Sequence, residues 1–294
     1  MTQAATRHRA PSRTVPRQPV GELLRAWRKR RGFSQLDLAC EADVSTRHVS
    51  FLETGRSQPS RTMLLHLAER MDIPLRDRNA LLAAAGFAPV FSEHRLDDPE
   101  MQAARRAVDL VLTGHEPHPA LAVDRHWTLV AANRAIAPLL AGAAPDLLQP
   151  PVNVLRLSLH PSGLASRIEN LVQWRTHILH RLTRQIDVSA DPVLTALLDE
   201  LKGYPAPDGP AFNASNGRSD PLPSHDGVVV PLRLRTEAGT LSFFSTTTVF
   251  GTAVDVTLSE LAIEAFFPTD SATADVMRQA LARSRPSLDH AKHP

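Results

Sequence analysis

The sequence has little of what stabilises or anchors many secreted and membrane proteins. Its one cysteine, Cys40, excludes an internal disulfide framework and a cysteine zinc cluster. No run of about 18 apolar residues occurs, which argues against a membrane-spanning helix. Residues 1–19 carry arginines and prolines without the apolar stretch of a secretory signal. We therefore expect a cytoplasmic protein that begins with a disordered basic arm over residues 1–19.

Motifs of several enzyme classes are also missing. The chain has no Gly-x-Ser-x-Gly nucleophile elbow, no Gly-x-x-x-x-Gly-Lys phosphate loop and no His-Glu-x-x-His zinc helix. His177 and His180 lie one turn apart on an expected helix, but no acidic third ligand follows on the next turn. We expect no catalytic residues, no bound metal and no cofactor.

The charges divide the chain into two parts of opposite sign. Residues 1–80 hold 15 Lys and Arg against 8 Asp and Glu, a net charge of +7, and the remaining residues carry −5. A chain of 294 residues commonly forms two domains. A basic first part and an acidic second part suit a domain that binds nucleic acid, followed by one that does not.

Residues 20–87 have the pattern of a five-helix bundle. The first helix is predicted over about residues 20–31, with Leu24 and Trp27 facing the core and Gly32 ending it. The fourth and fifth helices are expected to begin after Ser60 and at Leu75.

The second helix is short and begins with a capping box. Ser34 and Asp37 have the spacing in which each side chain bonds the other residue's backbone N–H. Leu36, Ala39 and Cys40 are predicted to lie on the inner side of this helix, with Cys40 as a small core residue.

The third helix has the pattern of a DNA-recognition helix. Ser45 caps it, it runs to about Glu53, and Val49 and Leu52 face inward. In a helix-turn-helix the N-terminal end of this helix enters the major groove. The predicted DNA contacts are Gln35, Ser45, Thr46, Arg47, Ser50, Arg56 and Arg61.

Five of these seven contacts have a specific chemical reason. Arg47 can pair with guanine or with a phosphate, and Thr46 can offer a hydroxyl to a base and a methyl to thymine. Gln35 lies where its amide can meet a phosphate, and Arg56 and Arg61 are expected to clamp the backbone.

Two strings in this region resemble a known family. Residues 44–56 (VSTRHVSFLETGR) and 74–89 (PLRDRNALLAAAGFAP) are similar to the MmyB-like branch of the Xre, or lambda-repressor-like, helix-turn-helix family. The resemblance implies a transcription regulator that binds double-stranded DNA.

Past an expected linker at residues 88–98, the chain has an α+β pattern. A helix is predicted over about residues 99–113, with an apolar side made of Ala103, Ala104, Ala107, Val108 and Val111. Strands are predicted at residues 120–123, 127–131, 228–235, 239–250 and 259–267, and helices at 154–159, 166–186 and 192–201. Asn133 and Asn153 are expected to cap helices, and residues 203–226 to form a loop.

The order of these elements matches a PAS domain, in which helices cover one face of five antiparallel strands. The predicted fold class is multidomain: an all-α helix-turn-helix five-helix bundle at residues 20–87, plus an α+β PAS-like antiparallel sheet domain at residues 99–270. A C-terminal tail is expected over residues 271–294.

The second domain also resembles the MmyB-like family. Asn133, residues 153–157 (NVLRL), His160-Pro161, Asn170 and residues 251–270 (GTAVDVTLSELAIEAFFPTD) are similar to its C-terminal ligand-binding domain. The resemblance implies a PAS-like domain that can hold a long-chain fatty acid. One departure is that members often carry Trp directly after this asparagine, whereas Leu171 follows Asn170 here and Trp174 comes one turn later.

A fatty acid needs an apolar tunnel and a polar group at its carboxylate. The predicted wall residues, each of which is more often ordinary core, are Trp127, Leu129, Ile136, Leu155, Trp174, Ile178, Phe243 and Phe266. The predicted carboxylate partners are Asn133, Arg156 and His160. Arg156 suits a carboxylate because a guanidinium pairs with it bidentately, although a surface ion pair is an equal alternative.

Together these features predict a bacterial transcription regulator. It is expected to bind a pseudo-palindromic DNA site as a homodimer, because one recognition helix covers only a few base pairs. Its second domain is expected to bind a small hydrophobic ligand, a fatty acid. In the alternative, that domain serves only dimerisation or protein–protein interaction. A continuous apolar cavity would favour the first function, and a domain filled by side chains would favour the second.

Overall fold

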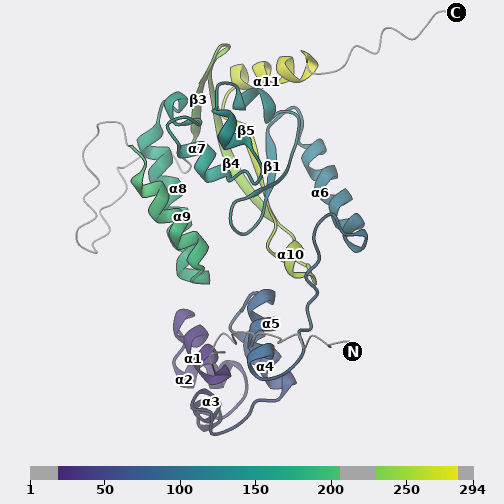
Figure 1. The fold of residues 1–294 in the computed structure, drawn as a ribbon, viewed down its shortest axis with the longest axis vertical. Coiled ribbons are helices and arrows are strands. Elements are labelled where there is room, and N and C mark those ends of the chain that lie inside the picture. Colours follow the sequence, from purple (N-terminus) through teal and green to yellow (C-terminus); the bar gives the residue numbers. More distant parts are fainter. Residues whose placement is uncertain (1–18, 206–229, 284–294) are drawn as a thin grey trace, which may run out of the picture. The chain divides into compact units, whose positions relative to one another are not determined.

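The computed structural model describes residues 19–205 and 230–283. It divides into two compact units, Met1–Phe91 and Ser92–Pro294 (Figure 1). The predicted arm up to residue 18 and most of the predicted loop at 203–226 lie outside the described residues. In the described part, no helix is both long and apolar enough to cross a membrane.

The first unit is a bundle of helices, as predicted. Its helices are α1 (Val20–Arg30), α2 (Gln35–Glu41), α3 (Thr46–Glu53), α4 (Arg61–Arg70) and α5 (Leu75–Ala84). Three serines begin α2, α3 and α4 by accepting a backbone N–H of the first turn: Ser34, Ser45 and Ser60. The capping box between Ser34 and Asp37 is confirmed.

The prediction for the inner side of α2 is wrong at two positions. Leu36 is 60% exposed and Cys40 is exposed, whereas Leu38, Ala39 and Ala42 are buried. At about 100° per residue, these three buried residues share one face, and positions 36 and 40 lie on the opposite one. An apolar side chain was therefore not enough to assign Leu36 to the core.

The exposure of Cys40 has a simple chemical consequence. We expect a maleimide to label this thiol in the native protein at a rate close to that in denaturant, because accessibility controls thiol modification. Mass spectrometry after timed labelling measures the rate, with Cys40→Ser as the unlabelled control. Labelling that begins only after denaturation would show that the thiol is covered.

A buried ion pair joins α1 to α3. Arg28 donates from Nε to Oε1 of Glu53 at 2.5 Å and from Nη2 to Oε2 at 2.9 Å. Both side chains are almost inaccessible, 8% and 3% exposed. The helices touch closely here, since a Cβ at Gly21 would lie 2.6 Å from the carbonyl oxygen of Glu53. Arg28 is thus part of the core although it is charged.

The second unit is built on one antiparallel sheet of five strands. The strands are β1 (Ala120–Val123), β2 (Leu129–Ala132), β3 (Leu232–Thr236), β4 (Gly239–Val249) and β5 (Ala262–Pro268), in the order β2-β1-β5-β4-β3. Thr236 pairs with Gly239, so β3 and β4 form a hairpin. This sheet confirms the PAS-like α+β fold class.

Helices cover the two faces of the sheet unequally (Figure 1). The large core cluster joins Val123, Leu234 and Phe243 of the sheet to α7 (Val154–Leu159), α8 (Leu171–Ser189) and α9 (Pro192–Gly203). A smaller cluster joins Ala120, Ala122 and Ile263 to α6 (Gln102–Gly114). Since side chains alternate along a strand, the two clusters lie on opposite faces.

Several local predictions for this unit need correction. Val111 of α6 is 44% exposed, and Leu112, which was not predicted, faces the sheet together with the predicted Val108. Trp127 lies in the turn between β1 and β2, with a φ of 66°. The residues expected to form a tail instead contain α11 (Ser271–Arg283), whose Met277 is 1% exposed.

Asn133 does not cap a helix as predicted. Its side chain accepts from the backbone N–H of Ala120 and donates to the carbonyls of Leu112 and His118. The short 3₁₀ helix nearby spans Ala137–Leu140 and has no side-chain cap. Asn153, by contrast, caps α7 through the N–H groups of Leu155 and Arg156. A buried asparagine amide can satisfy the ends of a strand as well as those of a helix.

The segment before α8 runs along the outer edge of β3. Ile168 forms an antiparallel bridge with Leu234. The backbone N–H of Glu169 donates to the carbonyl of Arg233 at 2.9 Å, and the N–H of Arg233 donates to Oδ1 of Asn170 at 3.1 Å. Residues 168–170 therefore cover the middle of this edge strand and fix where α8 begins.

Candidate functional site

The predicted recognition helix α3 presents a polar end to solvent. Val49 and Leu52 are 2% and 1% exposed, which turns the opposite side of α3 outward. Thr46 and Arg47 are exposed on that side, and Ser50 is half-buried. Ser45 is engaged as the cap of the helix through the N–H of His48.

An aromatic ring holds two arginines beside this end. Phe51 is half-buried, with Cζ of Arg47 5.0 Å and Cζ of Arg56 5.8 Å from its ring centroid. Cation–π contacts of this kind restrict a guanidinium while leaving its N–H groups available. Phe51 therefore packs under Arg47 and Arg56. Arg61 is exposed at the start of α4.

Gln35 has a partner within the protein. Its Nε2 donates to Oε2 of Glu53 at 2.8 Å, so its amide extends the buried pair with Arg28. A phosphate contact by this amide would have to form beside that hydrogen bond. The backbone N–H groups at the start of α2 lie in the same turn.

Six of the eight apolar ligand candidates gather in one place, whereas Leu129 and Ile136 are not part of that cluster. Trp127, Leu155, Trp174, Ile178 and Phe243 belong to the large core cluster, and Phe266 packs against it. The rings of Phe243 and Phe266 meet edge to face at 6.5 Å. Both indole N–H groups are satisfied: Trp127 donates to Gln185 at 2.9 Å and Trp174 to Ser158 at 3.0 Å. These side chains pack together between the sheet and α8.

Two of the three polar ligand candidates, Arg156 and His160, lie around Glu200 and Tyr204, and Asn133 is engaged elsewhere. Asn133 is buried and fully used by backbone groups. Arg156 pairs bidentately with Glu200 at 2.6 and 2.7 Å, and His160 places its ring edge-on to Tyr204 at 5.0 Å. Tyr204 in turn donates to Glu200. A carboxylate is therefore already bound to Arg156, and it belongs to the protein.

This ion pair predicts a pH dependence. The hydrogen bonds from Arg156 lower the pKa of Glu200 to about 2, from an ordinary 4.5. Because the pKa is lowered, the stability that Glu200 contributes is present above pH 4.5 and lost as the pH falls toward 2. Glu200→Gln should cost up to about 1 kcal/mol at pH 7, since both partners are over a third exposed.

Thermal unfolding of the wild type and Glu200→Gln, followed from pH 7 to pH 3, measures this effect. We expect the difference in Tm to shrink across the acid range. Asp199→Asn, at an exposed neighbour on α9, is the matched control and should leave the profile unchanged. A difference that is the same at every pH would show that the ion pair is not its source.

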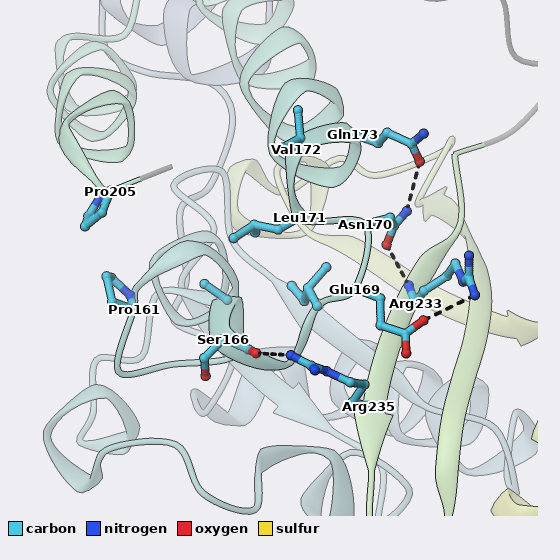
Figure 2. Close-up of a pocket in the computed structure, with 12 residues that line it drawn as sticks. Pro161, Ser166, Glu169, Asn170, Leu171, Val172, Gln173, Pro205, Arg233 and Arg235 are labelled. Carbon is cyan, nitrogen blue, oxygen red and sulfur yellow. Dashed lines mark hydrogen bonds and ion pairs between the residues drawn. The ribbon is translucent and has the colours of Figure 1, made fainter. Parts of the chain in front are cut away.

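The structure adds a groove at the start of α8 that the sequence did not reveal (Figure 2). Its volume is about 910 Å³. The lining residues come from the segment before α8, its first turn, β3 and the position just after α9: Pro161, Ala165, Ser166, Ile168, Glu169, Asn170, Leu171, Val172, Gln173, Pro205, Arg233 and Arg235. A second groove, of about 420 Å³, lies between α6 and β2. None of the predicted ligand residues lines either groove.

The sequence of β3 holds part of the information needed to predict this groove. Leu232, Arg233, Leu234 and Arg235 alternate between buried and exposed. The alternation predicts a strand, but not which segment its arginines face. In the described residues, no three His, Cys, Asp or Glu side chains gather as a metal site would require.

Comparisons with known proteins match a family model to each of the two domains. Residues 104–280 match the family model described as MmyB-like transcription regulator ligand binding domain, and residues 24–77 match a helix-turn-helix model. The first match spans more than half of the chain. No curated protein matches the sequence.

One solved structure, titled "Structure of an RNA-binding Light-Oxygen-Voltage Receptor", is 15% identical. The alignment covers 88% of this chain and 64% of that one, with a TM-score of 0.26. The chain thus spans less than two thirds of that structure, and a TM-score this low carries no conclusion about function.

Proposed function

Because the chain belongs to the MmyB-like transcription regulators, with a helix-turn-helix domain and a ligand-binding domain, we propose that its second domain binds a long-chain fatty acid and thereby controls DNA binding. The observation that carries this proposal is the match of residues 104–280 to a ligand-binding domain. The bacterial cytoplasm is the compartment we propose for it.

For DNA, we propose that Thr46, Arg47 and Ser50 face the bases. Their support is the exposed N-terminal end of α3, with Arg47 held over Phe51. Arg56, Arg61 and the first turn of α2 with Gln35 then contact phosphates. Two recognition helices in a homodimer would read the two halves of a pseudo-palindromic site.

For the ligand, we propose that the apolar chain lies between the sheet and α8. The support is the set of large apolar side chains gathered there, including Trp127, Trp174 and Phe243. Since these side chains pack against one another, a ligand has to separate them and occupy the space that opens. Leu155, Ile178 and Phe266 would line the same space.

Coupling between the domains requires a difference in affinity. A ligand shifts an equilibrium between two dimer geometries only by as much as it binds one of them more tightly. We propose that fatty acid binding changes the spacing of the two helix-turn-helix domains and so the affinity for DNA.

One observation favours a second candidate function. Six of the predicted wall residues pack in or against one core cluster, and none of the eight lines either groove. A second domain packed in this way also suits the alternative, in which it serves only dimerisation or protein–protein interaction.

The test is to purify the full chain, denature it, extract it with organic solvent and identify the extract by mass spectrometry. A stoichiometric fatty acid would support the sensor and identify the ligand class. An empty extract, together with no thermal shift on adding palmitate, would contradict the sensor and support the interaction domain.

A further inference from the structure

The groove at the start of α8 combines an apolar floor with arginines at its side (Figure 2). Alternation along β3 turns Leu232 and Leu234 into the core, and Arg233 and Arg235 away from it. The bridge between Ile168 and Leu234 brings the segment before α8 beside this strand. The two arginines thereby reach the groove that this segment borders.

The floor of the groove is the outer side of the large core cluster. Ile168 lines the groove, is 4% exposed and belongs to the same cluster as Trp174 and Phe243. Leu171 also lines the groove and packs against that cluster. An apolar chain lying on Ile168 and Leu171 would thus be directly above the space proposed for the ligand.

Among the residues that the structure describes, one cation of the groove has no counter-charge. Arg233 forms an ion pair with Glu169 at 3.2 Å, and Glu169 also accepts from Thr240 at 2.7 Å. Arg235 donates from Nη2 to the backbone carbonyl of Ser166 at 2.8 Å. Within residues 19–205 and 230–283, no carboxylate lies within ion-pair distance of Arg235. The guanidinium has five N–H donors, so it retains donors for an anion.

We propose that this groove is the mouth of the ligand site and that Arg235 binds the carboxylate of the fatty acid, an assignment that rests on the proposed function. The apolar chain extends from Arg235 over Ile168 and Leu171 toward the core. A groove of about 910 Å³ is in the size range of sites for small molecules. Arg156, the carboxylate partner expected from sequence, keeps its bond to Glu200 in this arrangement.

The experiment compares two ligands of the same chain length, one with a charged carboxylate head group and one with a neutral hydroxyl. Palmitate and hexadecan-1-ol are titrated calorimetrically into the full chain, as wild type and as Arg235→Gln. We expect Arg235→Gln to weaken palmitate binding by about tenfold, because a charge-assisted hydrogen bond is lost. Hexadecan-1-ol should bind both proteins with nearly equal affinity.

Two variants serve as controls. Arg184→Gln removes an exposed arginine of α8 outside the groove and should leave both affinities unchanged. Arg235→Lys keeps the charge and should recover part of the palmitate affinity.

Each other outcome has a distinct meaning. Equal loss for palmitate and the alcohol would show that Arg235 acts on the fold, and an unchanged palmitate affinity would show that the carboxylate lies elsewhere. Either result would contradict the assignment of the carboxylate to Arg235 in this groove, while leaving the proposed function intact. A wild-type protein that binds neither compound would contradict both the proposed function and this assignment.

Discussion

Replacing Glu53 with alanine is expected to destabilise the first domain by about 3–5 kcal/mol, the cost of breaking a buried ion pair by removing one partner. The substitution leaves the guanidinium of Arg28 buried without a counter-charge. It also removes the acceptor of the Gln35 amide. Burial alone would raise the pKa of Glu53, but the hydrogen bonds from Arg28 and Gln35 outweigh it and hold the pKa below its usual value. The group removed is therefore a carboxylate at neutral pH.

Hydrogen exchange on the full chain measures this loss within the first domain. Amides of α1 and α3 should lose about two to four orders of magnitude of protection. Glu69→Ala, at an exposed acidic position on α4, should change little. The double variant Arg28→Met with Glu53→Leu should recover much of the loss, because it leaves no buried charge. If Glu53→Ala behaves like Glu69→Ala, the ion pair does not hold α1 on α3.

Replacing Arg47 with alanine is expected to weaken specific DNA binding by about 1–3 kcal/mol, or about 5- to 150-fold, and to relax one base position. Arg47 is exposed on α3 and already oriented by the ring of Phe51. An oriented guanidinium loses less freedom when it pairs with guanine. Selection of binding sites from a random library, with each variant, gives the base preference at every position.

Arg61→Ala is the comparison for this experiment. An arginine that contacts only a phosphate should lower the affinity for all sequences alike and reduce the salt dependence by about one ion. If Arg47→Ala keeps the full sequence preference of the wild type, Arg47 contacts the backbone and not a base.

Much of the first domain could be predicted, because its helices begin with local signals. Ser34, Ser45 and Ser60 each cap a helix as the sequence indicated. The errors came from assigning faces by residue type alone. Leu36 is apolar and exposed, whereas Arg28 is charged and buried. Only the partner supplied by α3 makes a buried arginine possible, and that partner is distant in sequence.

The strands of the second domain could be predicted from the sequence, but its groove could not. Apolar alternation located the five strands to within a few residues. The groove depends on the bridge between Ile168 and Leu234, a pairing between segments far apart in the chain. Arg156 illustrates the same difficulty, because its partner Glu200 lies on another helix. Sequence indicated which groups could bind a carboxylate but not which of them were already engaged.

The bridge between Ile168 and Leu234 also bears on self-association. A strand at the border of a sheet offers unpaired backbone groups to other chains, and proteins protect such borders to avoid aggregation. Here residues 168–170 and two outward arginines protect β3. The cover is the same backbone that borders the groove. Any event that pulls this segment away to widen the groove would leave β3 open to recruit a strand from a neighbouring molecule, so widening carries a risk of precipitation.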